Sequence, residues 1–305
     1  MAFISSASHV IFKVKSDSIT ILMGAPGETH SNIVVEGNGN HYGRYSMNGD
    51  SINHISIPLS KHKRNLLALY KATEASNGPV LFYGVKANNI SPANLKTNAT
   101  IESTGCSITC GFDAYTKEIP CGTGDWYDQR NAYPACCPLI ARRLNIDYTL
   151  DSVSGRGIYR NWNDEDTAPV IGNVYPTANL DGHKAKPWNF SGKKQPDLVS
   201  ISLGTNDLSN GDGKKNRKPF DVEKFTIKYI SFANQIFERC FNKKIALLTN
   251  SMVSGANNHL LLECLKKIMA HIDIQHTVAI FEFVPMNQGG CDTHPDLKEL
   301  QVMAD

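Results

Sequence analysis

The sequence has no long apolar run and no marked excess of either charge. No stretch approaches the roughly eighteen consecutive apolar residues that a membrane-spanning helix needs, so we expect no membrane insertion. The 31 Lys and Arg residues nearly balance the 29 Asp and Glu residues, for a net charge of +2. This balance argues against nucleic acid or an anionic membrane as the main partner.

A signal peptide is also lacking, because the first residues are already strand-like. We expect a secreted or periplasmic protein whose leader is absent from this sequence, with a cytoplasmic protein as the alternative.

The eight cysteines lack the paired Cys-x-x-Cys spacing of a structural zinc site, so we expect no metal site. Cys240 and Cys264 fall within helical patterns and are expected to be buried as small apolar residues. Five others crowd the region that follows residue 105: Cys106, Cys110, Cys121, Cys136 and Cys137. One disulfide is possible in that region, and its pairing stays open.

The chain is long enough for two domains. Residues 8–88 carry only strand signals, separated by turn residues, and this spacing predicts a β-sandwich or jelly roll. Residues 86–98 are rich in Asn, Ser and Pro and are the best linker. We therefore expect domains at 1–97 and 98–305.

The second part of the chain alternates strands with helices. We expect strands at 99–104, 146–153, 197–203, 244–249 and 277–283, and helices at 132–144, 221–240 and 257–272. Strands of continuous apolar character that alternate with helices predict a parallel sheet covered on both faces. Reactive groups gather at the carboxyl ends of such strands.

Residues 105–111, Gly-Cys-Ser-Ile-Thr-Cys-Gly, follow the first of these strands. Their small side chains let the backbone pass close to a reacting group. We interpret the stretch as a sharp turn between a strand and a helix that presents Ser107 to solvent. An ordinary Gly/Ser loop is the alternative.

His294 is the best placed of the ten histidines to activate Ser107, because it follows the last strand and precedes Pro295, which can begin the closing helix. A serine hydroxyl is a poor nucleophile and needs such a base within hydrogen-bond reach. We expect the carboxylate of Asp292 to accept the Nδ1 proton, which leaves Nε2 free for Ser107. Alternatively, Asp292 or Thr293 only caps the following helix.

Ester hydrolysis through a tetrahedral intermediate also needs hydrogen-bond donors for the oxyanion. We expect three: the main-chain N–H groups of Ser107 and Gly155, and the side-chain amide of Asn206. Each follows a different predicted strand. Asn206 is alternatively a simple turn residue, and Gly155 and Gly157 alternatively only bend their loop.

Together these blocks resemble the ordered blocks of the SGNH, or GDSL-type, hydrolases. The blocks are residues 105–109, Gly155, residues 204–207 and residues 292–295. Within that superfamily, further stretches resemble carbohydrate esterase family 2. These are residues 69–75, 154–161, 188–190, 195–197 and 290–295.

The resemblance implies an N-terminal β-sandwich (jelly-roll) domain followed by a flavodoxin-like, three-layer α/β/α hydrolase domain with a parallel sheet. It implies a serine esterase that removes O-acetyl groups from xylan- or mannan-type polysaccharide or oligosaccharide through an acyl-enzyme, without a metal or organic cofactor. Ser107 would be the nucleophile, His294 the general base and acid, and Asp292 its orienter. Ser107, Gly155 and Asn206 would form the oxyanion hole.

Two positions depart from the family pattern. Cys106 stands where the family usually has the Asp of Gly-Asp-Ser, so a carboxylate that would brace the nucleophile turn is missing. We expect weaker bracing rather than a new nucleophile, since Cys106 would point away from His294. Thr293 stands where relatives often have an aromatic residue, so a sugar-stacking surface is either lost or supplied elsewhere.

Aromatic residues near the active edge are the candidates to supply that surface, because sugar C–H groups pack on aromatic faces. We expect Trp126, Tyr159 and Trp162 to bind substrate, with Trp126 in a polar loop the best placed. Tyr127 is a further candidate, whereas we expect Trp188 to be a packing anchor.

Two alternatives to the acetyl esterase remain at this stage. One is a carbohydrate-binding protein with a degenerate hydrolase domain. The other is a lipase-like esterase of the same superfamily, although the Gly-, Asn-, Asp- and Lys-rich loops favour a hydrophilic substrate.

Overall fold

The computed structural model describes residues 1–305 except 28, 50, 61–63, 94, 113, 165–166, 183–186, 191–194, 241–243 and 273–275. The described chain divides into two compact units, Met1–Lys96 and Thr97–Asp305. Position 94, part of the predicted linker, lies outside the described residues.

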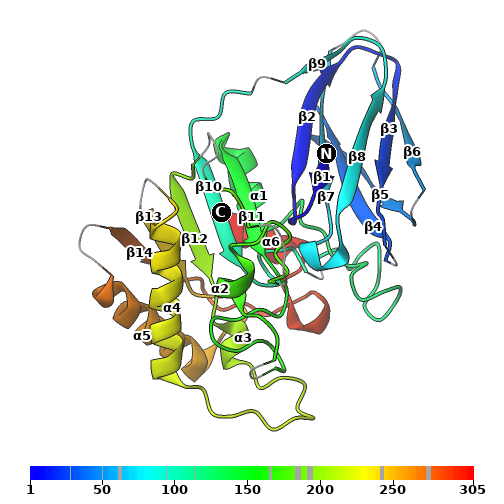
Figure 1. Ribbon diagram of the computed structural model, residues 1–305. Coiled ribbons are helices and arrows are strands. Elements are labelled where there is room, and N and C mark those ends of the chain that lie inside the picture. The colour runs from blue at the N-terminus through cyan, green and yellow to red at the C-terminus, as the bar shows by residue number, and fades with distance from the viewer. Residues whose placement is uncertain are drawn as a thin grey trace. The chain divides into compact units, whose positions relative to one another are not determined.

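The N-terminal unit is a sandwich of two antiparallel sheets, coloured blue to cyan in Figure 1. The sheet orders are β1-β8-β3-β6 and β5-β4-β7-β2-β9. The strands are β1 (Ala2–Phe3), β2 (His9–Val14), β3 (Ser18–Gly24), β4 (Ser31–Gly37), β5 (Asn40–Met47), β6 (Asn53–Pro58), β7 (Asn65–Lys71), β8 (Val80–Lys86) and β9 (Ile90–Pro92), with a short 3₁₀ helix η1 (Ala75–Asn77). Alternate residues such as Ile55 and Ile57 point into a shared apolar core, as expected for strands with one solvated face. The predicted sandwich is confirmed.

The C-terminal unit contains a five-stranded parallel sheet of order β11-β10-β12-β13-β14. The strands are β10 (Thr100–Gly105), β11 (Asp147–Ser152), β12 (Leu198–Ser202), β13 (Lys244–Leu248) and β14 (Thr277–Phe281). The helices are α1 (Cys136–Leu144), α2 (Ile171–Val174), α3 (Thr205–Leu208), α4 (Val222–Phe237), α5 (Gly255–His271) and α6 (Leu297–Ala304). Each of the five predicted strands is present, and so are the helices predicted at 132–144, 221–240 and 257–272.

Helices cover both faces of this sheet. Helix α4 packs beside α5, and α1 packs beside α6 on the other face (Figure 1). Helix α4 begins where Asp221 accepts a hydrogen bond from the Lys224 N–H, and it buries Phe225, Tyr229 and Phe232 toward the sheet. The predicted α/β/α layering is therefore confirmed.

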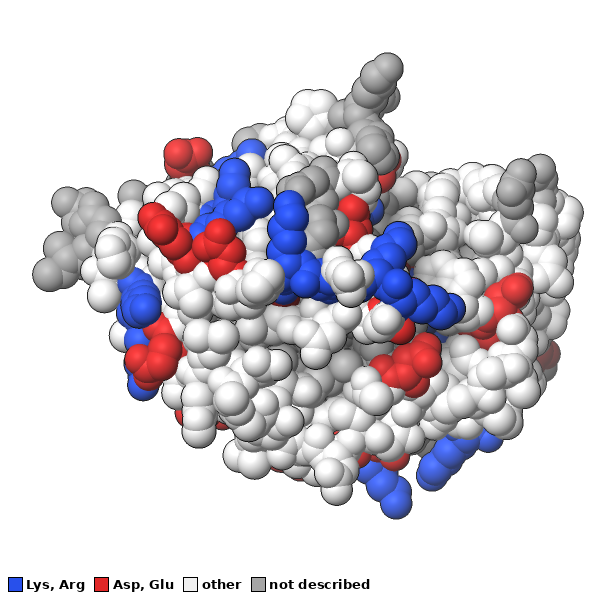
Figure 2. All heavy atoms as spheres, turned by 90° about the horizontal axis from the view of Figure 1, so that it is seen from below, with Lys and Arg blue, Asp and Glu red and all other residues white. Residues whose placement is uncertain are grey.

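On the surface that Figure 2 shows, basic and acidic side chains lie interspersed, and a broad area between them is uncharged. Among the described residues, none of the helices is long and apolar enough to cross a bilayer.

The face of the sheet toward α4 buries an acidic side chain. Glu102 on β10 is almost fully buried, and the Tyr175 hydroxyl donates a hydrogen bond to its Oε1 at 2.5 Å. Burial raises the pKa of Glu102, against the opposing effects of that hydrogen bond and of Arg239. Burial and the charge of Glu102 also raise the pKa of Asp151 on β11.

Glu102→Gln should stabilise the protein more at pH 8 than at pH 5. In the unfolded chain Glu102 ionises at its ordinary pKa, whereas in the folded chain its pKa is raised. Wild-type stability is therefore lost as the pH rises above that ordinary pKa, at about 1.4 kcal/mol per unit of pKa difference. We therefore expect Glu102→Gln to raise the free energy of unfolding, relative to wild type, more at pH 8 than at pH 5, as measured by urea unfolding.

The matched control is Glu263→Gln on the exposed side of α5, where no such gain should occur. If the free energy of unfolding depended on pH in the same way in wild type and Glu102→Gln, the buried carboxyl would not control this stability.

Candidate active site

The predicted reactive residues follow four strands of the parallel sheet. Ser107 follows β10, Gly155 follows β11, Asn206 follows β12, and His294 comes after β14. Because all these strands run in the same direction, their carboxyl ends form one edge of the sheet. Strand β10 pairs with β11 on one side and β12 on the other, which places the Ser107 turn between the loops that follow these two strands.

Ser107 lies in a set of tight hydrogen-bonded turns. Its carbonyl oxygen accepts hydrogen bonds from the N–H groups of Cys110 at 3.1 Å and Phe112 at 3.0 Å. A side chain at position 105 would lie 2.1 Å from Thr109 Oγ1, so only glycine fits there. The helix expected directly after Ser107 is absent from this described stretch, because Gly111 has a φ of +70° and the chain turns away.

The Ser107 side chain is 7% exposed, so the expectation of a solvent-presented serine is wrong. His294 accounts for part of this burial, because its Nε2 lies 2.8 Å from Ser107 Oγ. The two residues are 187 positions apart in the chain. The spatial pairing that the sequence predicted is therefore present in the structure.

His294 Nδ1 lies 3.0 Å from the main-chain carbonyl oxygen of Asp292. A carbonyl oxygen only accepts, so Nδ1 carries the proton and Nε2 accepts from the Ser107 hydroxyl. We had expected the Asp292 carboxylate in this role, and the hydrogen bond is made by its backbone instead. The Asp292 side chain is exposed, and its residue adopts left-handed dihedral angles of φ +48° and ψ +37°.

The alternative that Asp292 or Thr293 caps the last helix does not hold. Asp296 is the N-cap of α6, and its side chain accepts hydrogen bonds from the N–H groups of Lys298 and Glu299. Pro295 precedes this cap rather than beginning the helix.

Burial lowers the pKa of His294, and the positive charge of Arg130 acts in the same direction. The main-chain hydrogen bonds of Asp292 and Cys291 and the Asp292 charge oppose this shift. The lowered pKa keeps the imidazole neutral at neutral pH, as a general base requires.

Two aromatic rings and a buried cation lie near His294, and of these the sequence had indicated only Trp126. The Phe112 ring lies 4.5 Å from the imidazole. The Arg130 guanidinium, 1% exposed, lies 4.4 Å from the Phe112 centroid and 4.1 Å from that of Trp126. These cation–π contacts hold Phe112 and Trp126 near the imidazole of His294.

Asn206 and the loop that contains Gly155 are joined directly. Asn206 Nδ2 donates to the carbonyl oxygen of Arg156 at 2.8 Å. The neighbouring Asp207 is fully buried and accepts the N–H groups of Ile158, Tyr159 and Arg160. Gly155 and Asn206 thus lie close together, and their alignment with the Ser107 N–H stays a prediction.

Asp207 was not assigned a role from the sequence, although it ends the Gly-Thr-Asn-Asp block. A side chain at Gly157 would lie 2.1 Å from the Arg160 carbonyl oxygen and 2.7 Å from Asp207 Oδ2. Gly157 therefore does more than bend its loop, because it admits the Asp207 carboxylate.

The aromatic candidates separate by exposure. Trp126 and Trp162 are 58% and 48% exposed. The main-chain N–H of Trp162 donates to the Gly155 carbonyl oxygen. Tyr159 is buried, its hydroxyl accepts from the Asp221 N–H, and its ring packs on Phe220 and Phe225. The structure therefore does not support substrate stacking at Tyr159.

Two further aromatic expectations also change, in opposite directions. Tyr127 is buried beneath Trp126, with an edge-to-face ring contact at 5.4 Å. Trp188, which we expected to be a packing anchor, is 55% exposed.

The cysteines divide into one disulfide and six free thiols. Cys121 is bonded to Cys291, directly before Asp292. Cys240 and Cys264 are buried, as expected. Cys106 is also buried, and burial raises its pKa, so its thiol stays protonated and is unsuited to act as a nucleophile.

The chain matches no protein-family model. It is 25% identical over 258 residues to an acetylxylan esterase/glucomannan deacetylase of Cellvibrio japonicus (strain Ueda107), covering 82% of this chain and 68% of that protein. It is 28% identical over 311 residues to the cellulase/esterase CelE of Acetivibrio thermocellus, covering 98% of this chain. The match spans only 36% of that longer protein.

Solved structures agree with this sequence similarity. A family two carbohydrate esterase from Cellvibrio japonicus superposes with a TM-score of 0.86 at 20% identity, over 99% of this chain and 87% of that one. One from Clostridium thermocellum in complex with cellohexaose gives 0.83 at 24% identity, over 99% and 91%. A GDSL-like lipase from Bacteroides ovatus ATCC 8483 gives 0.58 at 10% identity, over 98% and 81%.

The fold is thus one shared by family two carbohydrate esterases and by a GDSL-like lipase. More particularly, the chain resembles the family 2 carbohydrate esterases along nearly its whole length, and that predicted resemblance is confirmed.

Asp292→Asn should lower kcat/KM for an acetyl ester by less than about tenfold, because the main-chain oxygen holds the tautomer. Replacing a triad aspartate that itself holds the histidine costs about 10⁴ in kcat. Loss of the Asp292 charge also lowers the pKa of His294, so the acid limb of the kcat/KM profile should move to lower pH. His294→Gln is the reference, and an equally large loss in Asp292→Asn would contradict this reasoning.

Proposed function

We propose that this chain is a serine esterase that removes O-acetyl groups from polysaccharide or oligosaccharide. The observation that carries the proposal is the 2.8 Å contact between Ser107 Oγ and His294 Nε2, with the opposite ring nitrogen bonded to a carbonyl oxygen. Acetylxylan and glucomannan appear in the names of the sequence relatives, which supports a xylan- or mannan-type substrate.

In the first half of the proposed reaction, His294 Nε2 takes the Ser107 proton as Oγ attacks the acetyl carbonyl carbon. The tetrahedral intermediate then collapses, the sugar oxygen leaves with the proton from His294, and the acetyl group remains on Ser107. A water molecule, deprotonated by His294, attacks this acyl-enzyme. Acetate leaves, and Ser107 recovers its proton.

We assign the oxyanion hole to the N–H groups of Ser107 and Gly155 and to the Asn206 amide. Asn206 Nδ2 carries two hydrogens, and the bond to the Arg156 carbonyl oxygen uses one of them. This bond fixes the plane of the amide, so the other hydrogen is held ready for the developing charge.

The sugar would stack on exposed aromatic faces beside the reactive serine. Trp126 contacts Arg130 and Tyr127 yet remains 58% exposed, whereas the main chain of Trp162 is bonded to Gly155. Both positions suit a flat sugar ring whose acetyl group reaches Ser107.

We also propose that residues 98–305 form the hydrolase domain and residues 1–97 a separate sandwich domain. A secreted or periplasmic location is supported by the Cys121–Cys291 disulfide, since such bonds persist mainly in oxidising compartments.

Ser107→Ala should abolish acetate release from acetylated xylan and from p-nitrophenyl acetate, with a loss of at least about 10³-fold, because no nucleophile remains. Circular dichroism should show an unchanged fold. Ser18→Ala at the exposed start of β3 is the control and should keep full activity. Full activity in Ser107→Ala would reject the proposal, and glycan binding without turnover in the wild type would favour the degenerate-domain alternative.

Trp126→Ala should raise KM for acetylated xylo-oligosaccharides by about 2- to 10-fold, the range that corresponds to one aromatic contact. The kinetics on p-nitrophenyl acetate should change less than about twofold, because this small ester does not need the platform. Trp188→Ala removes an equally exposed ring and is the matched control. If both substitutions changed KM for the oligosaccharide equally, Trp126 would not be a substrate-binding residue.

A further inference from the structure

The turn that carries His294 has an uncommon backbone. Asp292 and Thr293, neither of them glycine, both have left-handed φ values of +48° and +62°. Residues 282–289, which lead to this turn, form neither helix nor strand. Such conformations persist where the surroundings fix them, so the turn needs an anchor.

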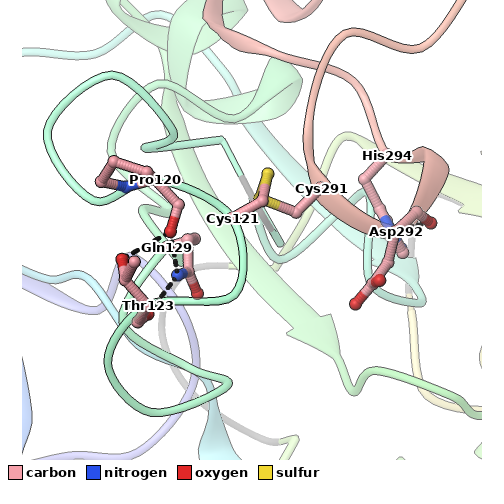
Figure 3. The surroundings of a disulfide bond; sticks show 7 residues. All are labelled: Pro120, Cys121, Thr123, Gln129, Cys291, Asp292 and His294. Atoms are coloured by element: carbon pink, nitrogen blue, oxygen red, sulfur yellow. Dashed lines mark hydrogen bonds between the residues drawn. A yellow bond between two sulfur atoms is a disulfide. The ribbon is translucent and has the colours of Figure 1, made fainter.

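Cys291 provides a covalent anchor at the start of this turn. It is bonded to Cys121, 170 residues earlier in the chain, with the two Cα atoms 5.5 Å apart. Its carbonyl oxygen accepts the His294 N–H at 2.9 Å. Figure 3 shows the bond between the Cys121 loop on one side and Asp292 and His294 on the other.

The Cys121 loop, defined here as residues 114–131, is held by its own hydrogen bonds. The buried Gln129 side chain donates through Nε2 to the carbonyl oxygens of Pro120 at 3.2 Å and Thr123 at 2.7 Å (Figure 3). The Thr123 hydroxyl also donates to the Pro120 carbonyl oxygen. Cys121 is therefore a fixed point and not the tip of a loose loop.

The base of the same loop is attached to the nucleophile turn. The Asn131 N–H donates to the Gly111 carbonyl oxygen at 2.9 Å, and the Gly111 N–H donates to that of Ile108. A side chain at Gly111 would lie 2.3 Å from the Asn131 carbonyl oxygen, so this contact is close. The Cys121 loop is thus hydrogen-bonded at its base to the turn of Ser107. Through the Cys121–Cys291 disulfide it is also linked to the turn of His294.

We propose that Cys121 and Cys291 are positioning residues, whose disulfide holds the His294 turn in register with the Ser107 turn. This inference rests on the proposed function. Catalysis needs Nε2 within hydrogen-bond reach of Oγ, and a displacement of about 1 Å can cost 10²-fold in rate. With the Cys121–Cys291 disulfide intact the protein is an efficient esterase, and with both cysteines reduced it is slower.

The first test is the double variant Cys121→Ala/Cys291→Ala. We expect kcat on p-nitrophenyl acetate to fall by about 10- to 100-fold with KM changed less than threefold, because the small ester binds without the His294 turn. Cys264→Ala removes another buried sulfur, from α5, and is the matched control with unchanged kcat. All assays run well below the unfolding midpoint of each variant.

A second readout is the pH profile. The charged groups that act on His294 are Asp292 on its own turn and Arg130 on the Cys121 loop, and both remain in the double variant. A loosened turn hydrates the imidazole, so the acid limb of kcat/KM should move to higher pH. If the disulfide only stabilised the fold, its removal would lower the unfolding midpoint and leave this limb in place.

The wild-type protein provides a test that does not depend on folding of the variant. Dithiothreitol transfers two electrons and two protons, breaks the S–S bond into two thiols, and becomes the cyclic disulfide itself. Cys121 is exposed, so the reductant can reach the bond. With circular dichroism unchanged, kcat should fall toward that of the double variant and recover on reoxidation, whereas the double variant should not respond.

Proton NMR follows the same change without an activity assay. The His294 Nδ1–H, bonded to the Asp292 carbonyl oxygen, should give a downfield resonance that is absent in His294→Gln and weakened by reduction. An unchanged kcat, pH profile and resonance after reduction would overturn this inference. Acetate release that is lost in Ser107→Ala but unaffected by reduction would overturn it while leaving the proposed function intact.

Discussion

The site depends on one contact, in which the imidazole of His294 meets the hydroxyl of Ser107 across 187 residues of chain. The parallel sheet brings the two turns to a common edge, because every strand that precedes a reactive residue ends there. A sheet edge alone places loops within several ångströms of each other. The exact distance between the Ser107 hydroxyl and the His294 imidazole is set by contacts between loops, which the sheet does not determine.

Those contacts bury a titratable or charged side chain at two points beside Ser107. Asp207 is enclosed and accepts three backbone N–H groups, which draws the 157–160 segment against α3. Arg130 is enclosed between the rings of Phe112 and Trp126. Burial raises the pKa of Asp207, and its backbone hydrogen bonds oppose that shift. Such groups are costly to bury unless they are hydrogen-bonded or packed on polarisable groups, so these contacts restrict the shape of the site.

The sequence predicted the elements of both units because strand and helix periodicity is local. It also predicted Ser107 and His294 as a pair, since each follows a strand whose neighbours could be inferred. It did not reveal the disulfide, Phe112 or Arg130, because loop-to-loop contacts leave no periodic signal. Tyr159 was misassigned because an aromatic residue in a polar segment looks exposed, whereas Phe220 and Phe225 cover it.

The bond at Nδ1 shows how a base can be oriented without a buried carboxylate. An aspartate oxygen fixes the tautomer and also adds a full negative charge, which raises the basicity of the ring. A carbonyl oxygen fixes the same tautomer with only a dipole, so burial and Arg130 keep the His294 pKa low. The orientation then depends on where the backbone of Asp292 points, which its left-handed dihedral angles set. In this chain the conformation of the turn takes over the orienting role that a side chain has in a triad.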